Sequence, residues 1–165
     1  MPAALENRFD LYMRPLVQTY RALGIKAQHR PINDIHVGGK KIGGTGAAQI
    51  GSADVVVGSL MFTFDKATMA RVLKVPSEKM RDKIVESLEQ YMTAMGELLP
   101  SLSDRETVKE LYLRQCAEVL GVEIVPGRWT AREETVATEL DGRFVSFKMY
   151  TRIRDRSLTF PQNRL

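Results

Sequence analysis

The chain has 165 residues, of which 44% are hydrophobic and 27% charged, with a formal net charge of +4 and a pI near 9.3. This length suits one domain with a hydrophobic core, and no apolar run approaches the ~18 residues of a membrane helix. The lone cysteine, Cys116, excludes a disulfide framework and a structural zinc site, and the amino-terminal residues lack signal-peptide character. We therefore expect a single-domain cytoplasmic protein without a membrane partner.

Apolar residues recur at intervals of three and four from Phe9 to Leu23, which predicts an amphipathic helix that Gly24 ends. Pro15 lies inside this pattern, so the helix is expected to bend or begin there.

Strands are expected next, over residues 26–30, 34–37 and 41–50, with Gly38-Gly39 as a hairpin turn because glycine adopts positive φ readily. Residues 55–64 are apolar on both faces and predict a central strand.

The second half of the chain predicts four helices and a last short strand over residues 122–125. The helix starts are marked by Asp65, Pro76-Ser77, Ser103 and Thr130. Ser103 and Glu106 have the spacing of a capping box, and Gly121 is expected to end the helix that they open. Together the elements predict an α+β fold, in which helices flank a mainly antiparallel sheet.

The most informative stretch follows Pro31. Asn33-Asp34 opens an alternating strand that leads to Lys40-Lys41 between glycines, and then to small residues: Gly43, Gly44, Thr45, Gly46 and Ala47. Cations between glycines let a phosphate oxygen contact backbone amides and an ammonium together. An exposed hairpin pair of lysines is the alternative, and Asn33 and Asp34 could simply close a turn.

This stretch closely resembles the lysine motif of lipoate-protein ligases, in which an Asn-Asp-apolar strand leads to Gly-Lys-Lys-Ile/Val-small-Gly. The resemblance continues in the first helix and in residues 57–65 and 69–80, and it covers about residues 8–150. It implies a biotin/lipoate protein ligase-like fold. We interpret residues 1–165 as one partial catalytic domain, the half that carries the lysine motif.

The resemblance also implies site residues. Lys41 matches the family's required lysine, which binds the phosphate and carbonyl of lipoyl-adenylate. Asp34 matches the aspartate at the nucleotide and its Mg²⁺, and Asn33 supports the strand entry. The small residues Gly43, Gly44, Thr45, Gly46 and Ala47 would line the same pocket. Many members carry His-Gly-Ser/Thr where this chain has Val57-Gly58-Ser59, which leaves the role of the Val57 position open.

The implied reaction is ATP-dependent activation of lipoate to lipoyl-adenylate, followed by transfer to a lysine of a lipoyl-carrier protein (a GcvH-like protein or an E2 lipoyl domain). ATP, Mg²⁺ and lipoate are the expected cofactors and substrates. Three alternatives stay open: an octanoyltransferase-type enzyme that uses a thioester donor, a biotin ligase, and a non-catalytic subunit that docks the carrier.

Family members also carry an Arg-Arg-x-Ser-Gly-Gly-Gly segment, which this sequence lacks. We therefore expect the carboxyl-terminal half of a split ligase, whose amino-terminal half is a separate polypeptide with that glycine-rich lipoyl-binding segment. The expected heterodimer interface is apolar, exceeds ~2,000 Å² and is formed by the first helix and residues 55–64.

The other chemistry-bearing residues have plainer interpretations. The basic excess lies around Lys40-Lys41 and near the carboxyl end without interleaved aromatics, so nucleic acid is not the expected partner. His29 and His36 are interpreted as ordinary strand histidines, and Cys116 as a core residue.

Overall fold

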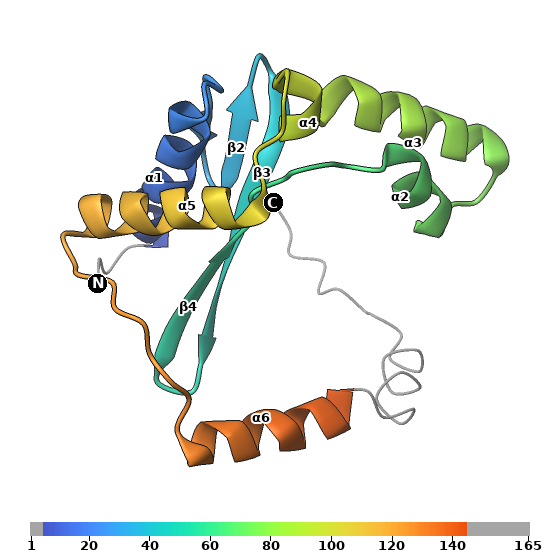
Figure 1. Cartoon of the computed structure of the whole chain (residues 1–165). Coiled ribbons are helices and arrows are strands. Elements are labelled where there is room, and N and C mark those ends of the chain that lie inside the picture. Colours follow the sequence, from blue (N-terminus) through green and yellow to red (C-terminus); the bar gives the residue numbers. More distant parts are fainter. Residues whose placement is uncertain (1–4, 145–165) are drawn as a thin grey trace. The chain divides into compact units, whose positions relative to one another are not determined.

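A computed structural model of the chain describes residues 5–144 and divides the chain into two units between Ile124 and Val125 (Figure 1). Among the described residues, the first unit contains a sheet and five helices, and the second contains one helix. The strands are β1 (Gln28–Arg30), β2 (Asp34–Val37), β3 (Lys40–Ile50) and β4 (Ala53–Gly58). The helices are α1 (Leu5–Ala22), α2 (Lys66–Val72), α3 (Glu78–Tyr91), α4 (Met95–Leu98), α5 (Arg105–Leu120) and α6 (Ala131–Phe144). The predicted α+β class is confirmed.

The four strands form an antiparallel sheet in the order β1-β2-β3-β4. The predicted hairpin is present: Val37 pairs with Lys40 across Gly38 and Gly39, whose φ values are 55° and 84°. A second tight turn at Gly51 joins β3 to β4. The short β1 covers only the last part of the strand predicted over residues 26–30.

The prediction of a central strand over residues 55–64 is wrong. β4 ends at Gly58 and stands last in the strand order of the described sheet. Beyond it, the backbone takes other partners: Met61 N–H donates to the Tyr20 hydroxyl, and the carbonyls of Met61 and Phe62 accept from the first residues of α4. These bonds direct the chain away from the sheet, so its apolar residues do not continue a strand.

The strand predicted over residues 122–125 is also absent. The N–H of Val122 instead donates to the carbonyl of Ala117, which closes the turn after α5. Gly121 adopts the left-handed conformation there with φ 64°, and therefore ends the helix as expected.

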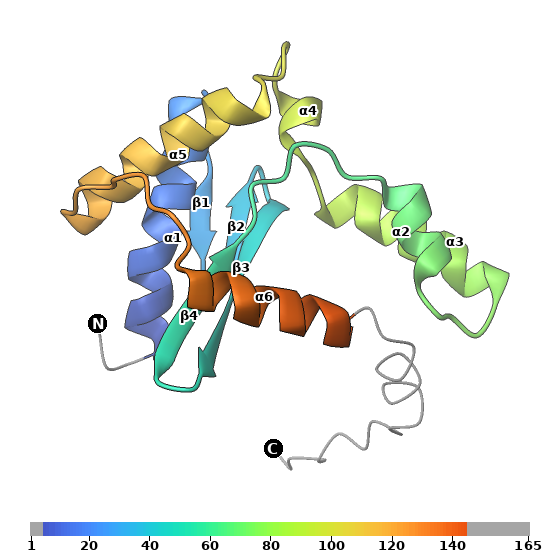
Figure 2. The same cartoon turned by 60° about the horizontal axis from the view of Figure 1, so that its bottom comes forward.

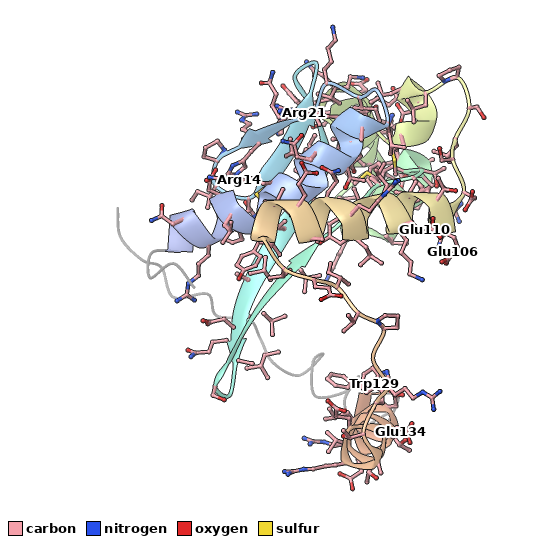
Figure 3. The ribbon with its side chains drawn as sticks, turned by 60° about the vertical axis from the view of Figure 1, so that its left-hand side comes forward. Arg14, Arg21, Glu106, Glu110, Trp129 and Glu134 are labelled. Atoms are coloured by element: carbon pink, nitrogen blue, oxygen red, sulfur yellow. The ribbon has the colours of Figure 1, made fainter. Side chains whose placement is uncertain are left out.

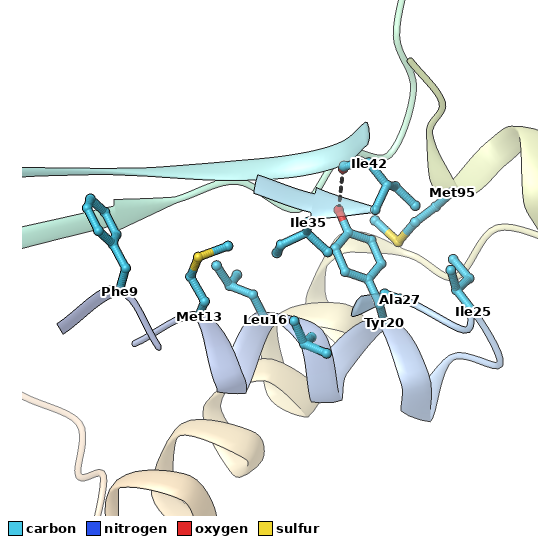
Figure 4. Close-up of a cluster of buried hydrophobic side chains, with 10 residues drawn as sticks. Phe9, Met13, Leu16, Tyr20, Ile25, Ala27, Ile35, Ile42 and Met95 are labelled. Atoms are coloured by element: carbon cyan, nitrogen blue, oxygen red, sulfur yellow. Dashed lines mark hydrogen bonds between the residues drawn. The ribbon is translucent and has the colours of Figure 1, made fainter. Parts of the chain in front are cut away.

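One face of the sheet packs against α1, and α5 packs on α1 (Figure 2). The apolar stripe of α1 is buried and forms the core with the strands and α4 (Figure 4). Its members are Phe9, Met13, Leu16, Val17 and Tyr20, each at most 7% exposed. This corrects the expectation that the first helix offers its apolar surface to a partner, because the sheet already covers that surface. The helix also continues through Pro15 rather than beginning there.

Helix caps follow the sequence with one change. Asp65 and Ser77 accept hydrogen bonds from the backbone three residues ahead and open α2 and α3. At α5 the cap is Asp104 rather than Ser103: its carboxylate accepts from both the N–H and the hydroxyl of Thr107. The observed cap therefore lies one residue beyond the Ser103 of the predicted capping box. Cys116 is buried on α5, as predicted.

In the second unit, Thr130 and Glu133 exchange hydrogen bonds in a capping box that opens α6. Figure 3 shows Trp129 just before this helix and Glu134 in its first turn. Within residues 5–144, no helix combines the length and apolar character needed to span a bilayer.

Candidate functional site

The site begins with an irregularity in the pairing of β2 with β3. Ile35 pairs with Gly43, but the next residue, His36, pairs with Lys41, so Ile42 is an extra residue on β3. Such a bulge reverses the alternation of side chains beyond it. Asp34, His36 and Lys41 therefore share one face of the sheet, which we call the site face. Without the extra residue, Lys41 would point toward α1.

An ionic cluster occupies the site face. Lys41 Nζ lies 2.5 Å from Asp34 Oδ1, and His36 Nε2 lies 3.8 Å from Asp34 Oδ2. The side chains of Lys41 and Asp34 are each about a third exposed, so solvent screens their pair and its contribution to stability is modest, ~0–1 kcal/mol. Asp34 thus lies between two nitrogen-bearing groups, and its carboxylate orients the lysine.

Gly44 lies beneath this cluster. A Cβ at Gly44 would come within 3.3 Å of both Cε and Nζ of Lys41. The missing side chain therefore gives Lys41 room to lie across the strand toward Asp34.

The neighbouring lysine is used differently. Lys40 Nζ donates to the carbonyl of Glu89 at 2.8 Å, in the last turn of α3. The carboxyl end of a helix carries partial negative charge, which favours an ammonium there. Lys40 therefore contacts the end of α3, whereas Lys41 lies on the site face.

Asn33 and Thr45 hold the start of β2 against β3. Asn33 Nδ2 donates to the Thr45 carbonyl at 2.6 Å, and Thr45 N–H donates to the Asn33 carbonyl at 2.8 Å. Asn33 therefore supports the strand entry, and its predicted contact with a ligand stays a prediction. Thr45 is buried.

The predicted small residues lie on both faces of β3. By strand alternation Gly44 and Gly46 belong to the site face, whereas Gly43, Thr45 and Ala47 belong to the opposite face. The structure therefore brings Asp34, Lys41, Gly44 and Gly46 together and not the other three. Across from Gly46, Val57 also lies on the site face and is 64% exposed.

Sequence reasoning missed two residues of this site. His36 follows Asp34 by two positions, and on a strand that spacing is the signal for a shared face. The sequence marked Tyr20 only as an apolar helix position, yet its hydroxyl donates to the Ile42 carbonyl at 2.8 Å (Figure 4). The same hydroxyl accepts from Met61 N–H, also at 2.8 Å. Burial raises the pKa of Tyr20 to about 12, so the hydroxyl remains protonated.

The donor set limits what metal could bind. Among residues 5–144, no three His, Cys, Asp or Glu side chains group closely enough to hold an ion. Mg²⁺ often binds through one or two carboxylates together with substrate phosphates and water. Asp34 fits an ion of that kind, whose remaining ligands come from a nucleotide, and does not fit a cage built by the described residues.

Comparison with known proteins shows the family of the chain. Residues 2–117 match the family model of the lipoyl protein ligase A/B catalytic domain. The chain belongs to this family. The resemblance carried by the lysine motif is thus confirmed.

Two curated relatives show the range of the family. The chain is 29% identical over 115 residues to octanoyltransferase LipM of Kyrpidia tusciae, which covers 68% of this chain and 41% of that protein. It is 28% identical over 146 residues to lipoate-protein ligase A subunit 1 of Thermoplasma acidophilum, covering 82% and 55%. The chain therefore spans about half the length of these relatives.

Solved structures share the fold. A bi-partite lipoate protein ligase from Thermoplasma acidophilum, described with its E2 lipoyl domain, superposes with a TM-score of 0.76 at 26% identity, covering 84% of this chain and 55% of that one. A lipoate-protein ligase A bound with ATP superposes with a TM-score of 0.67 at 21% identity, covering 85% and 56%, and shows the fold alone. The ligase-like fold is thus confirmed.

Proposed function

We propose that this chain is the lysine-bearing part of a lipoate-protein ligase, which activates lipoate with ATP and transfers the lipoyl group to a lysine of a carrier protein. The observation that carries the proposal is the Lys41 ammonium, held by Asp34 on the site face beside Gly44. The similarity to a bi-partite ligase described with an E2 lipoyl domain supports a carrier of that class.

The chemistry needs a fixed positive charge at two moments. In the first step a lipoate carboxylate oxygen attacks the α-phosphorus of ATP and pyrophosphate leaves. In the second, the carrier's lysine amine attacks the carbonyl of the mixed anhydride and AMP leaves. Negative charge grows first on phosphate oxygens and then on the carbonyl oxygen, and a preorganised ammonium stabilises both. Lys41 has the compact charge and flexible reach for this role.

Asp34 has two uses in this scheme. It orients the Lys41 ammonium through Oδ1, and its carboxylate is the group of the site face that would contact Mg²⁺. When bound, such an ion would neutralise phosphate charge during adenylation. Gly44 and Gly46 leave space against the strand, in which the adenylate and its acyl chain would lie.

A second polypeptide segment is part of the proposal. The chain is similar to subunit 1 of a Thermoplasma acidophilum ligase and to a structure described as a bi-partite ligase. On the site face of the β3–β4 hairpin, Ile50 and Val57 are 67% and 64% exposed. We propose that a subunit with the glycine-rich lipoyl-binding segment covers this hairpin and completes the pocket, so that the isolated chain is inactive.

A thioester-dependent octanoyltransferase is the second candidate, because similarity to octanoyltransferase LipM favours it. There the same ammonium would polarise the thioester carbonyl, the carrier lysine would attack, and the thiol would leave without ATP.

One pair of assays separates the two candidates. The chain is mixed with a candidate partner that carries the glycine-rich segment. Lipoate-dependent exchange of labelled pyrophosphate into ATP then reports adenylation, and the mass of an E2 lipoyl domain reports transfer. We expect both signals in the mixture and neither from the chain alone. Octanoyl transfer from a thioester without pyrophosphate exchange would establish the second candidate, and robust lipoylation by the chain alone would overturn the split enzyme.

A further inference from the structure

Tyr20 lies on the helix behind the sheet, yet both of its hydrogen bonds reach segments beside the site. The hydroxyl donates to the carbonyl of Ile42, the extra residue of the bulge, and accepts from the N–H of Met61 beyond β4. Its side chain is fully buried. One hydroxyl thus ties α1 to the residue that follows Lys41 and to the chain that leaves the sheet.

The bulge needs such an anchor because an extra residue interrupts the ladder of backbone hydrogen bonds. Buried backbone groups without a ladder partner require another. At Ile42 the carbonyl is satisfied by Tyr20, and at Lys41 the carbonyl accepts from Thr93 N–H at 2.9 Å. The connection from α3 to α4 therefore holds the backbone of Lys41, and α1 holds that of the next residue, Ile42.

The packing around Gly43 reinforces this anchor. A Cβ at Gly43 would lie 2.8 Å from the Ser59 carbonyl oxygen and 3.3 Å from the Tyr20 hydroxyl. The bulge, the hydroxyl and the segment after β4 therefore fill one space without a gap for a side chain, and a shift of any of them moves the others.

We propose that Tyr20 is a positioning residue for Lys41. Its hydroxyl fixes the Ile42 bulge, and the bulge places the Lys41 ammonium on the site face beside Asp34. The effect on catalysis rests on the proposed function, whereas the effect on the backbone at Lys41 does not.

The test replaces only the hydroxyl, in Tyr20→Phe. The matched control is Tyr112→Phe on α5, whose burial also raises its pKa to about 12, and whose hydroxyl bonds to Cys116 rather than to the Ile42 carbonyl. Hydrogen exchange of the 40–46 segment is measured on the chain alone. In the assembled ligase, kcat and KM are measured separately.

We expect Tyr20→Phe to accelerate exchange in the 40–46 segment and to lower kcat about tenfold to a hundredfold, as for a misplaced catalytic group, with KM nearly unchanged. Tyr112→Phe should leave both readouts as in the natural chain. Unchanged exchange in Tyr20→Phe would overturn the anchor. Faster exchange with an unchanged kcat, in an assembly that is active, would overturn the link to Lys41. If the assembly proves inactive, the exchange result alone still decides the anchor.

A second variant keeps the test decisive if Tyr20→Phe does not fold. The methyl group of Gly43→Ala would crowd the Tyr20 hydroxyl and the Ser59 carbonyl, whereas the methyl group of Gly46→Ala would have no atom within 4 Å. Gly43→Ala should accelerate exchange in the 40–46 segment and Gly46→Ala should not. Equal exchange in the two variants would contradict the proposal.

Discussion

On the face of the β2–β3 pair that turns toward α1, Ile35 and Ile42 are fully buried, whereas on the opposite face the side chains of Asp34, His36 and Lys41 are 15–35% exposed. The same few residues of backbone supply both sets. The buried face gains its free energy from apolar surface removed from water. On the site face the charged groups stay accessible to solvent and bury less surface. The Ile42 bulge places Ile42 on the buried face and Lys41 on the site face of the same strand.

Truncating one residue on each face gives the largest expected difference between the two faces in the free energy of unfolding. Ile35→Ala should lower the free energy of unfolding by about 2–5 kcal/mol, because it leaves a cavity among fully buried side chains. Val57→Ala, on the exposed site face, should change it by less than about 0.5 kcal/mol. Urea unfolding of both variants gives the two values, and similar losses would mean that the site face is covered.

The lysine pair gives the next largest effect, this time on activity. In the proposed ligase assembly, Lys41→Ala should reduce lipoylation of the carrier about a hundredfold, equivalent to ~3 kcal/mol of transition-state stabilisation. Lys40→Ala removes a contact with the end of α3 and should be much milder. Initial rates of carrier modification compare the two variants. A damaging Lys40→Ala beside a tolerated Lys41→Ala would show that the bulge does not set the register.

Two glycines on adjacent strands sharpen the comparison further. A Cβ at Gly58 would lie 2.3 Å from Leu16 Cδ1 of the buried α1, whereas a Cβ at Gly46 would meet nothing within 4 Å. Gly58→Ala should therefore lower the free energy of unfolding by about 1–3 kcal/mol through overpacking. Gly46→Ala should be neutral or raise it by up to about 1 kcal/mol, since alanine restricts the unfolded chain. Thermal unfolding of the two variants tests the difference, which equal melting temperatures would refute.

Local signals in the sequence predicted much of this fold. The spacing of apolar residues placed α1, the Gly38-Gly39 pair fixed the first hairpin, and Asp65 and Gly121 marked helix ends. Each depends on residues close in sequence. The predictions that failed depend on distant partners: β4 ends because residues 61–62 bond with Tyr20 and α4, which no local pattern reveals.

The site shows the same division. The motif predicted Lys41 and Asp34, and their 2.5 Å contact is consistent with a shared role. The motif could not show that Gly43, Thr45 and Ala47 turn to the other face, because the reversal depends on one extra residue in the pairing of β2 with β3. Nor could it show Tyr20, whose role comes from a hydroxyl 22 residues away in sequence from Ile42.

The smallest expected effect concerns a helix rather than the sheet, namely the acid sensitivity of the start of α5. Hydrogen bonds from the Thr107 hydroxyl and N–H hold the pKa of Asp104 below its usual range. A carboxylate whose pKa is lowered on folding stabilises the folded state above its unfolded pKa, about 3.9, and that contribution is lost as the pH falls through the folded value.

Asp104→Asn keeps a good helix cap but cannot titrate. Its unfolding free energy should therefore fall less steeply than that of the natural chain below about pH 4, and Thr107→Val should flatten the same slope by removing the hydroxyl. Urea unfolding at several acid pH values measures these slopes. Identical slopes in all three proteins would show that Asp104 does not carry the acid sensitivity of the folded chain.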